Sequence, residues 1–336
     1  MTPAQRRRAT FAALLGGLPL VIAVGLSVGS VRLPTLGVMK ALLGSADGLE
    51  PLGRTILWTI RMPRVLLAAV IGGGLAAVGA VLQSVFRNPI ADSGLLGVGA
   101  GAAFGAVLAV KLGLAATTFL ALPAAAFAGA ALAISAVYFL AHATGRATLE
   151  GLLLTGIAVS ALASAATSTL LVTTEEYRIK VVIFWLAGGL DGRGWPHLQL
   201  AAGAIVPAVA LLVLLARPLD VLALGDEEAA SLGVRVHLTR LGLLGLAALV
   251  TGSATAVAGA VPFVGLVSPH ALRPLVGPLA RHLLPASFLG GALLVVVADA
   301  CARCVNPTFD LPLGSLTALV GAPYFLIALR GTGDRR

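Results

Sequence analysis

Long apolar stretches separated by short polar segments recur along the whole chain. A helix needs about 20 apolar residues to cross the hydrocarbon core of a bilayer. Nine stretches of suitable length lie near residues 10–31, 64–83, 94–112, 115–141, 151–172, 196–216, 239–261, 284–303 and 313–330. A tenth, near 263–275, is broken by Pro269. The pattern therefore predicts an all-α polytopic membrane protein with about ten transmembrane helices, forming a single integral membrane domain over residues 1–336.

Basic residues lie at both ends of this pattern. Arg6 to Arg8 precede the first stretch, and Arg330, Arg335 and Arg336 follow the last. Cytoplasmic segments are enriched in Lys and Arg, and an even number of spans returns the chain to its starting side. We therefore expect a multi-pass protein of a bacterial inner membrane with both termini in the cytoplasm.

The composition excludes two broad classes of protein. Hydrophobic residues make up 58% of the chain and charged residues only 11%, whereas soluble domains carry about 25% charged residues. The formal net charge is +9, but no basic run exceeds Arg6 to Arg8 and no aromatic residues alternate with cations. Neither a water-soluble globule nor a nucleic-acid-binding protein is expected.

An internal repeat is visible when the chain is compared with itself at an offset of 180 residues. Gly72 then aligns with Gly252, and Gly79-Ala80-Val81 with Gly259-Ala260-Val261. The first copy would run inward in the second span and the second copy outward in the seventh. This is the arrangement of inverted repeats in transporters.

One polar segment, at about residues 219–235, is too polar to cross a membrane and too regular for a linker. Acidic residues after Gly225 lie where the positive end of a helix dipole favours them, and Gly233 can end the helix. We expect a short capped helix on the cytoplasmic face that docks into a groove of a soluble partner. An ordinary amphipathic loop helix is the alternative. The candidate docking residues are Gly225, Asp226, Glu227, Glu228, Ala229, Ala230, Leu232 and Gly233.

A second cytoplasmic turn, Arg87 to Asp92, joins the second and third spans. Pro89 ends the helix because it lacks a backbone N–H and forces Asn88 into extended geometry. A rigid polar turn of this kind suits a gate at the mouth of a pathway. It is equally consistent with a plain connection between two helices.

On the predicted outer side, Arg61, Arg64 and Arg303 lie at helix ends. Asp299 and Arg303 are four residues apart, so they share one helix face and can neutralise each other. Guanidinium groups bind carboxylates through paired hydrogen bonds. We therefore expect the three arginines to form a basic rim that receives the carboxylates of a docking partner.

Other motifs favour structural roles. The glycines from Gly97 to Gly105 lack the spacing of a nucleotide-binding loop and are expected to bring helices close together. His270 stands alone, which favours a structural role over haem ligation. Cys301 and Cys304 are too few for a zinc site, and packing is favoured over a disulfide. The chain also lacks the motifs of ATP hydrolysis and of common hydrolases. We expect no enzymatic activity, metal or cofactor of its own, and a separate source of energy.

Several ordered motifs resemble the permease family of type II ABC importers that includes the FecCD and cobalamin permeases. They are Arg61-Met62-Pro63-Arg64, Gly79 to Gln83, Asn88-Pro89-Ile90-Ala91, Leu224-Gly225 to Leu232-Gly233, Phe263 to His270, and Leu311 to Gly314 with Gly321-Ala322-Pro323. The resemblance extends from about Arg61 to Leu329.

The resemblance implies ten helices and a homodimer around one central pathway, with two cytoplasmic ATPase subunits and a periplasmic binding protein as partners. Asp226 to Gly233 would then lie in the ATPase cleft. Arg61, Arg64 and Arg303 match arginines that receive glutamates of the binding protein, and Asn88 with Ile90 matches the cytoplasmic gate. The expected function is import of an iron chelate, haem or a ferric siderophore. A cobalamin importer, a secondary transporter, and a membrane enzyme or assembly factor remain as alternatives.

Overall fold

The computed structural model describes residues 1–336 except 46–47, 144–148, 176–181, 184, 306–309 and 334–336. The described residues are mainly helical and contain no strand. The helices are α1 Pro3–Ser27, α2 Thr35–Leu42, α3 Pro51–Thr55, α4 Met62–Val85, α5 Val98–Lys111, α6 Ala121–Ala143, α7 Leu149–Val172, α9 Trp195–Leu214, α10 Ala216–Leu222, α11 Asp226–Ser231, α12 Val236–Ala258, α13 Val264–Val276, α14 Ala280–Val305 and α15 Leu313–Gly333.

The number of membrane-crossing helices agrees with the sequence. Seven helical stretches of the described chain are long and apolar enough to cross a membrane. They are α1, α3 to α4 taken as one stretch over Pro51–Val85, α6, α7, α9, α12 and α14. The shorter apolar helices α5 and α15, together with the proline-containing α13, bring the total to the expected ten.

Two parts of the first 61 residues differ from the prediction. The helix expected from about residue 10 begins at Pro3, because Thr2 caps it and Gln5 bonds back to the Thr2 backbone. Arg6 to Arg8 are therefore inside α1. Helices α2 and α3 and the π-helical turn Ile56–Arg61 were not predicted. Helix α3, this turn and α4 together form one continuous helical stretch of 35 residues, Pro51–Val85.

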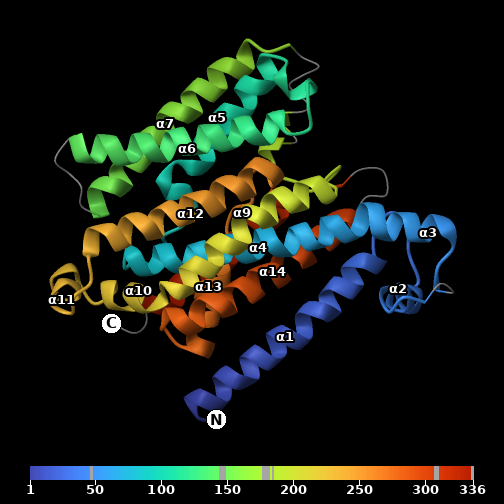
Figure 1. Cartoon of the computed structure of the whole chain (residues 1–336), viewed down its shortest axis with the longest axis horizontal. Coiled ribbons are helices and arrows are strands. Elements are labelled where there is room, and N and C mark those ends of the chain that lie inside the picture. The colour runs from blue at the N-terminus through green and yellow to red at the C-terminus, as the bar shows by residue number, and fades with distance from the viewer. Residues whose placement is uncertain (46–47, 144–148, 176–181, 184, 306–309, 334–336) are drawn as a thin grey trace.

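The long helices form stacked layers (Figure 1), with α5, α6 and α7 in one layer, α4, α9 and α12 in the next, and α1, α13 and α14 beyond. Helix α4 is the most enclosed of the long apolar stretches, with 83% of its apolar window buried. It crosses α14 where Gly72 meets Gly291. A Cβ atom added to Gly72 would lie 2.3 Å from the Gly291 carbonyl oxygen. Only glycine at this crossing lets the two backbones touch.

The bundle has two functionally distinct ends (Figure 1). At one end lie α10, α11, the turn after α4 and the N-terminus, and we call it the α11 end. At the other lie Arg61, the last turn of α1 and the last turn of α14, and we call it the Arg61 end. Helices α4 and α12 run in opposite directions between these ends, as predicted for the inverted repeat. Local structure differs between its copies, since Gly79 lies inside α4 whereas Gly259 ends α12 with φ +69°.

The helical ladder is broken between α12 and α13, whereas Pro269, which the sequence suggested would break the tenth stretch, lies inside the continuous helix α13. Residues 259–263 are not helical, and Phe263 has φ +66°. The protein itself satisfies the freed backbone, because Gly189 donates its N–H to the Ala258 carbonyl at 2.8 Å. Gly188 approaches so closely that a Cβ atom there would lie 2.0 Å from the Ala260 carbonyl oxygen. Irregular backbone in a membrane protein requires cover of this kind.

Candidate functional site

The predicted docking helix is present as α11, at the end of the bundle. Gly225 precedes it with φ +151°, and Gly233 follows it with φ +82°, so both glycines mark the ends as expected. The carboxyl groups of Asp226, Glu227 and Glu228 all lie in its first turn, near the positive end of the helix dipole. The segment 219–235 is not one helix, because α10 ends at Leu222 and residues 223–225 turn the chain before α11 begins.

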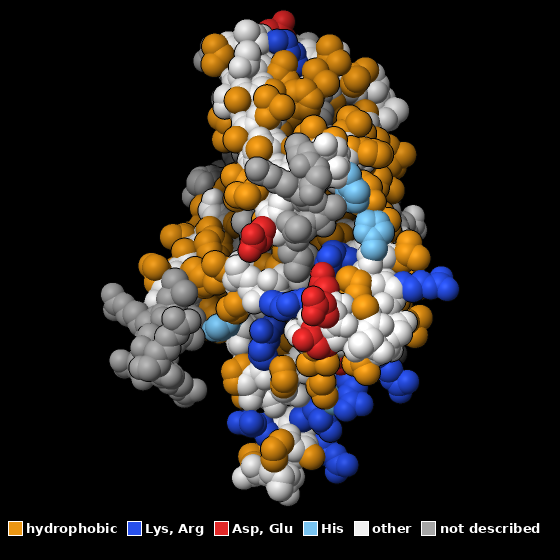
Figure 2. Space-filling model, turned by 90° about the vertical axis from the view of Figure 1, so that its left-hand side faces the viewer, with side chains coloured by type: hydrophobic (Ala, Val, Ile, Leu, Met, Phe, Trp, Pro, Cys, Tyr) orange, Lys and Arg blue, Asp and Glu red, His pale blue; other side chains and the backbone are white. Residues whose placement is uncertain are grey.

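One face of α11 packs on the protein and the other is open to solvent. Ala229 is fully buried, whereas Glu227, Glu228, Ala230 and Leu232 are exposed. Leu224 and Leu232 are each 64% exposed at the two ends of the helix. Figure 2 shows acidic side chains gathered at this end of the molecule, with basic and apolar side chains beside them. An acidic helix flanked by two exposed leucines is the kind of surface that docks into a partner groove.

Asp226 points inward, unlike the other acids of α11. Its Oδ1 accepts from Nη2 of Arg87 at 2.9 Å, and both of its oxygens accept from Nη2 of Arg240 at 2.7 and 2.8 Å. Arg87 lies in the turn after α4, and Arg240 in the second turn of α12. Asp226 therefore ties α11 to the predicted gate turn. The sequence did not reveal either arginine, because their contacts span 139 and 14 residues of chain.

The turn predicted as a gate is tightly hydrogen-bonded. Helix α4 ends at Val85, before Pro89, and Arg87 adopts φ +49°. The Asn88 side-chain oxygen accepts from the Ile90 N–H at 3.0 Å, which closes an Asx turn. Ile90 is 46% exposed. The geometry fixes the position of Ile90, and a gating role for Asn88 and Ile90 stays a prediction.

Asp92 completes this turn and contacts α13. A Cβ atom on Gly265 would lie 2.6 Å from Asp92 Oδ1, so the carboxylate lies directly against that glycine. The Ser93 hydroxyl donates to it at 3.4 Å. Burial raises the pKa of Asp92, and the hydrogen bonds from Ser93 only partly oppose this effect. The turn thus holds an acid whose charged form is disfavoured.

The three predicted docking arginines do lie together at the Arg61 end, but they do not form an open rim. Arg61, Arg64 and Arg303 are only 4, 7 and 6% exposed. Arg61 Nη1 donates to the Leu26 carbonyl at 2.8 Å, and Arg303 Nη2 donates to the Gly25 carbonyl at 2.9 Å. These carbonyls belong to the last turn of α1, which has no helical donors left for them. Two cations therefore cap the negative end of that helix.

Arg64 is held by carboxylates rather than by carbonyls. Its Nη2 lies 2.8 Å from Asp299 Oδ1, and its Nη1 lies 2.6 Å from Asp310 Oδ2. Asp299 also pairs with Arg303 at 3.0 Å across one helical turn, as the sequence predicted, and it is 1% exposed. Asp191 approaches Arg64 at 3.8 Å with a side chain that is 87% exposed. Asp191 and Asp310 were missed because they lie in loops far along the chain.

The remaining motifs occupy structural positions. Gly101 and Gly105 lie against Gly129 and Ala125 of α6, which confirms close helix packing. His270 stacks edge-on with Tyr324 at 6.0 Å between ring centroids. Cys301 and Cys304 are both free and exposed, and the Cys304 thiol donates to the Ala300 carbonyl. No group of three His, Cys, Asp or Glu that could hold a metal occurs among the described residues.

The comparison with protein families decides the assignment. The sequence profile of the FecCD transport family matches residues 17–331, nearly the full chain. The chain belongs to the FecCD transport family. As a FecCD protein it is 40% identical to the hemin transport system permease protein HmuU of Yersinia pestis, over 93% of this chain and 94% of that protein. It is 44% identical to the cobalamin import system permease protein BtuC of Halobacterium salinarum, over 84% of this chain and 75% of that protein.

Solved structures agree with this FecCD assignment. A metal-chelate type ABC transporter in an inward-facing conformation superposes with a TM-score of 0.85 at 29% identity, covering 96% of this chain and 99% of that one. A further relative, the Fe(3+) dicitrate permease protein FecD of Escherichia coli, is 39% identical over 81% of this chain and 84% of that protein. These FecCD relatives are membrane-embedded transport subunits.

Proposed function

We propose that this protein is the membrane subunit of an ABC importer that carries an iron chelate, haem or a ferric siderophore, into the cytoplasm. The observation that carries the proposal is the link between α11 and the turn after α4. Asp226 holds Arg87, the residue before Asn88, so a displacement of α11 acts directly on the predicted gate. The sequence contains no nucleotide-binding motif, so the energy that displaces α11 would come from a separate ATPase subunit.

The exposed face of α11 is the docking site for that ATPase subunit. Glu227, Glu228 and Leu232 project from the end of the bundle, free of the contacts that hold Asp226 and Ala229. We assign the α11 end to the cytoplasm, with both termini, because the ATPase subunits work there. One ATPase subunit per permease copy would make two in the complete importer.

A second permease copy would cover the open face of α7. Ala158, Ala161, Ala165 and Ser168 share one face of this helix and are all exposed. Small residues at this spacing allow close helix approach. A homodimer enclosing a central pathway beside α7 accounts for this face.

On the periplasmic side, a substrate-binding protein would dock over the Arg61 end. Arg64 is the point at which docking and internal pairing compete, because its carboxylate partners Asp191 and Asp310 lie in loops rather than in the bundle. A carboxylate of the binding protein can replace either of them. Docking in this view exchanges one ion pair for another.

A bulky chelate with little net charge suits a pathway between helices as apolar as these. The relatives include permeases named for hemin, Fe(3+) dicitrate and cobalamin. Cobalamin is the second candidate, since a cobalamin permease is 44% identical to this chain.

The decisive experiment is reconstitution of the permease in vesicles with its ATPase and binding protein. Haem, a ferric siderophore and cobalamin are offered separately, and ATP turnover and uptake are measured together. We expect one iron chelate to stimulate both. Uptake driven by an ion gradient without ATPase subunits would overturn the proposal in favour of a secondary transporter, and stimulation by cobalamin alone would replace the iron chelate.

A further inference from the structure

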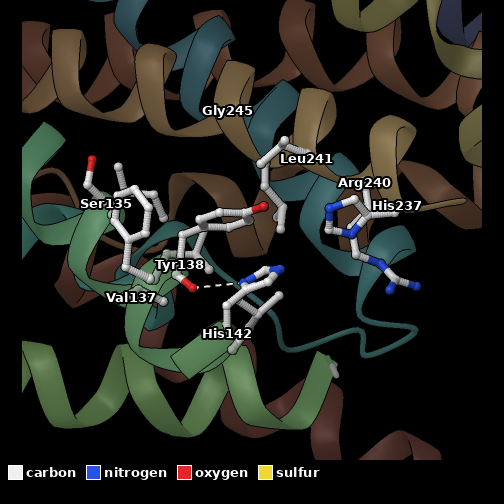
Figure 3. A pocket seen from close by; sticks show the side chains of 13 residues that line it. Ser135, Val137, Tyr138, His142, His237, Arg240, Leu241 and Gly245 are labelled. Carbon is white, nitrogen blue, oxygen red and sulfur yellow. Dashed lines mark hydrogen bonds between the residues drawn. The ribbon is translucent and has the colours of Figure 1, made fainter. Parts of the chain in front are cut away.

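A groove lies between α6 and α12, beside the contact of Arg240 with Asp226. It has a volume of about 300 Å³, within the range of ligand pockets of about 300–1,000 Å³. Figure 3 shows Tyr138 and His142 on α6 at one side, with His237 and Arg240 on α12 at the other. The described helices that wall it cross the membrane, so whatever fills it reaches it from the bilayer or from its surface.

The groove is polar at one end and apolar along its length. Its polar end lies in the last turn of α6 and the first two turns of α12, next to α11. From there the lining becomes apolar toward the middle of the bundle, through Phe139, Leu241, Leu244 and Ile134. Eight residues of helix separate His142 from Ile134, which is about 12 Å at 1.5 Å per residue. This gradient follows the change from the membrane surface to the hydrocarbon.

The polar end presents hydrogen-bonding groups without a full set of partners. The Nδ1 of His142 is 2.9 Å from the Tyr138 carbonyl oxygen and donates to it, which leaves Nε2 as a hydrogen-bond acceptor for a headgroup. The Nε of Arg240 is buried and has no hydrogen-bond partner in the described structure. Arg240 is 13% exposed at its side chain and already shares Asp226. A further negative group beside it would complete its hydrogen bonding.

From this arrangement we infer that the groove binds an anionic phospholipid, its headgroup at His142, His237 and Arg240 and an acyl chain along Phe139, Leu241 and Leu244. Its place in the cytoplasmic leaflet rests on the proposed function, which assigns the α11 end to the cytoplasm. Basic pockets between transmembrane helices on the cytoplasmic side suit such headgroups. The exposed apolar side chains beside the groove, Phe139 at 68% and Leu238 at 57%, lie where lipid chains would cover them.

The bound lipid would also affect α11. Arg240 joins the groove to α11 because its Nη2 binds Asp226, and a phosphate at its free Nε would lie beside that ion pair. Binding of an anionic lipid would therefore adjust how firmly α11 is fixed to the bundle.

The test measures lipid binding directly on the purified, detergent-solubilised permease. Phosphatidylglycerol, phosphatidylcholine with the same acyl chains, and inorganic phosphate are each titrated, with bound lipid counted by native mass spectrometry. We expect phosphatidylglycerol to bind at least about fivefold more tightly than phosphatidylcholine, as a single interfacial charge contributes. Equal binding of the two lipids would overturn the inference, as would competition by inorganic phosphate at concentrations equal to those of the lipid.

Two variants separate the headgroup from the chain. His142→Gln with His237→Gln removes both imidazole rings from the polar end, and His282→Gln, in the first turn of α14 and outside the lining, is the control. Gly245→Leu blocks the groove, because a Cβ at Gly245 meets no atom within 4 Å and the larger side chain projects into it. Gly242→Leu, equally unobstructed and outside the lining, is its control. Both test variants should lose the preference for phosphatidylglycerol and both controls should keep it. Unchanged binding in the test variants would refute the site.

Discussion

Single carboxylates in this protein hold pairs of arginines, and their burial decides how much each pair matters. Asp299 is 1% exposed between Arg64 and Arg303, whereas Asp226 is about half exposed between Arg87 and Arg240. A buried pair is costly to break because it leaves an uncompensated charge, while an exposed pair contributes little to stability. The two acids should therefore respond differently to the same substitution.

Asp299→Asn should strongly destabilise the protein. It removes the buried charge shared by Arg64 and Arg303 and leaves Arg303 without a carboxylate partner in the described part of the chain, which costs about 3–5 kcal/mol. Asp191→Asn removes a partner of the same Arg64 at 3.8 Å, but from an exposed side chain, and should cost less than about 1 kcal/mol. Thermal unfolding of both variants in detergent, followed by size-exclusion fluorescence, gives the comparison. Equal unfolding midpoints for the two variants would contradict a larger contribution of the buried Asp299 ion pairs.

Asp226→Asn should damage transport more than stability. The exposed pairs with Arg87 and Arg240 contribute about 1 kcal/mol or less, so the fold should persist. Without them α11 no longer moves the turn after α4, and we expect uptake per ATP hydrolysed to fall about tenfold. Glu227→Gln, on the outer face of the same helix, should instead weaken ATPase association and leave that ratio unchanged. A normal ratio in Asp226→Asn would show that the ion pairs transmit nothing.

The raised pKa of Asp92 gives a pH dependence with a definite sign. A carboxyl whose pKa is higher in the fold than in the unfolded chain binds more protons when folded. The free energy of unfolding therefore falls as pH rises from the ordinary pKa of an aspartate through the raised pKa of Asp92. Asp92→Asn should raise the unfolding midpoint at neutral pH, and the gain should disappear in acid, where the wild-type carboxyl is also neutral. A gain that is independent of pH would point to a cause other than charge.

Helix positions were more predictable than the contacts between helices. Hydrophobic length located ten helices, and glycines located the ends of α11, because both signals are local in the sequence. Helices α2 and α3 were not predicted because they are short and lie outside the predicted transmembrane stretches. The burial of Arg61 could not be predicted either. Its partner at the end of α1 is the Leu26 carbonyl, 35 residues earlier, and a backbone carbonyl gives no signal in a sequence.

The crossing of α4 and α14 should be sensitive to any added side-chain atom. Gly72→Ala places a methyl group 2.3 Å from the Gly291 carbonyl oxygen, so the helices must separate, at a cost of about 1–3 kcal/mol. Gly203→Ala in α9 meets no atom within 4 Å and should stabilise its helix by about 0.5–1 kcal/mol. Opposite shifts in unfolding midpoint are expected. A shift of the same sign in both would argue against contact at the crossing.

Considered from end to end, the bundle joins an arginine-rich site on one side of the membrane to an acidic helix on the other through α4. Arg64 begins that helix and Arg87 follows it, so each proposed partner would act on the same rigid element. The α4 contacts with α14 and α13 are backbone to backbone at Gly72 and Gly79, which leaves little room for bending between the two ends. Docking on one side of the membrane can then displace α4 as a rigid body and so reach the other side.

Competition at Arg64 provides a test of docking that does not require destroying the arginine cluster. If a carboxylate of the binding protein replaces an internal partner of Arg64, removal of the exposed competitor should favour docking. Asp191→Asn should therefore strengthen binding-protein association, by about two- to fivefold at low salt, with the gain shrinking as salt screens the exchange. Glu50→Gln, an acid on the same side before α3, serves as the control for the change in surface charge. Weaker association of Asp191→Asn alone would mean that Asp191 itself contacts the partner, and Arg64 would no longer be the residue for which the two proteins compete.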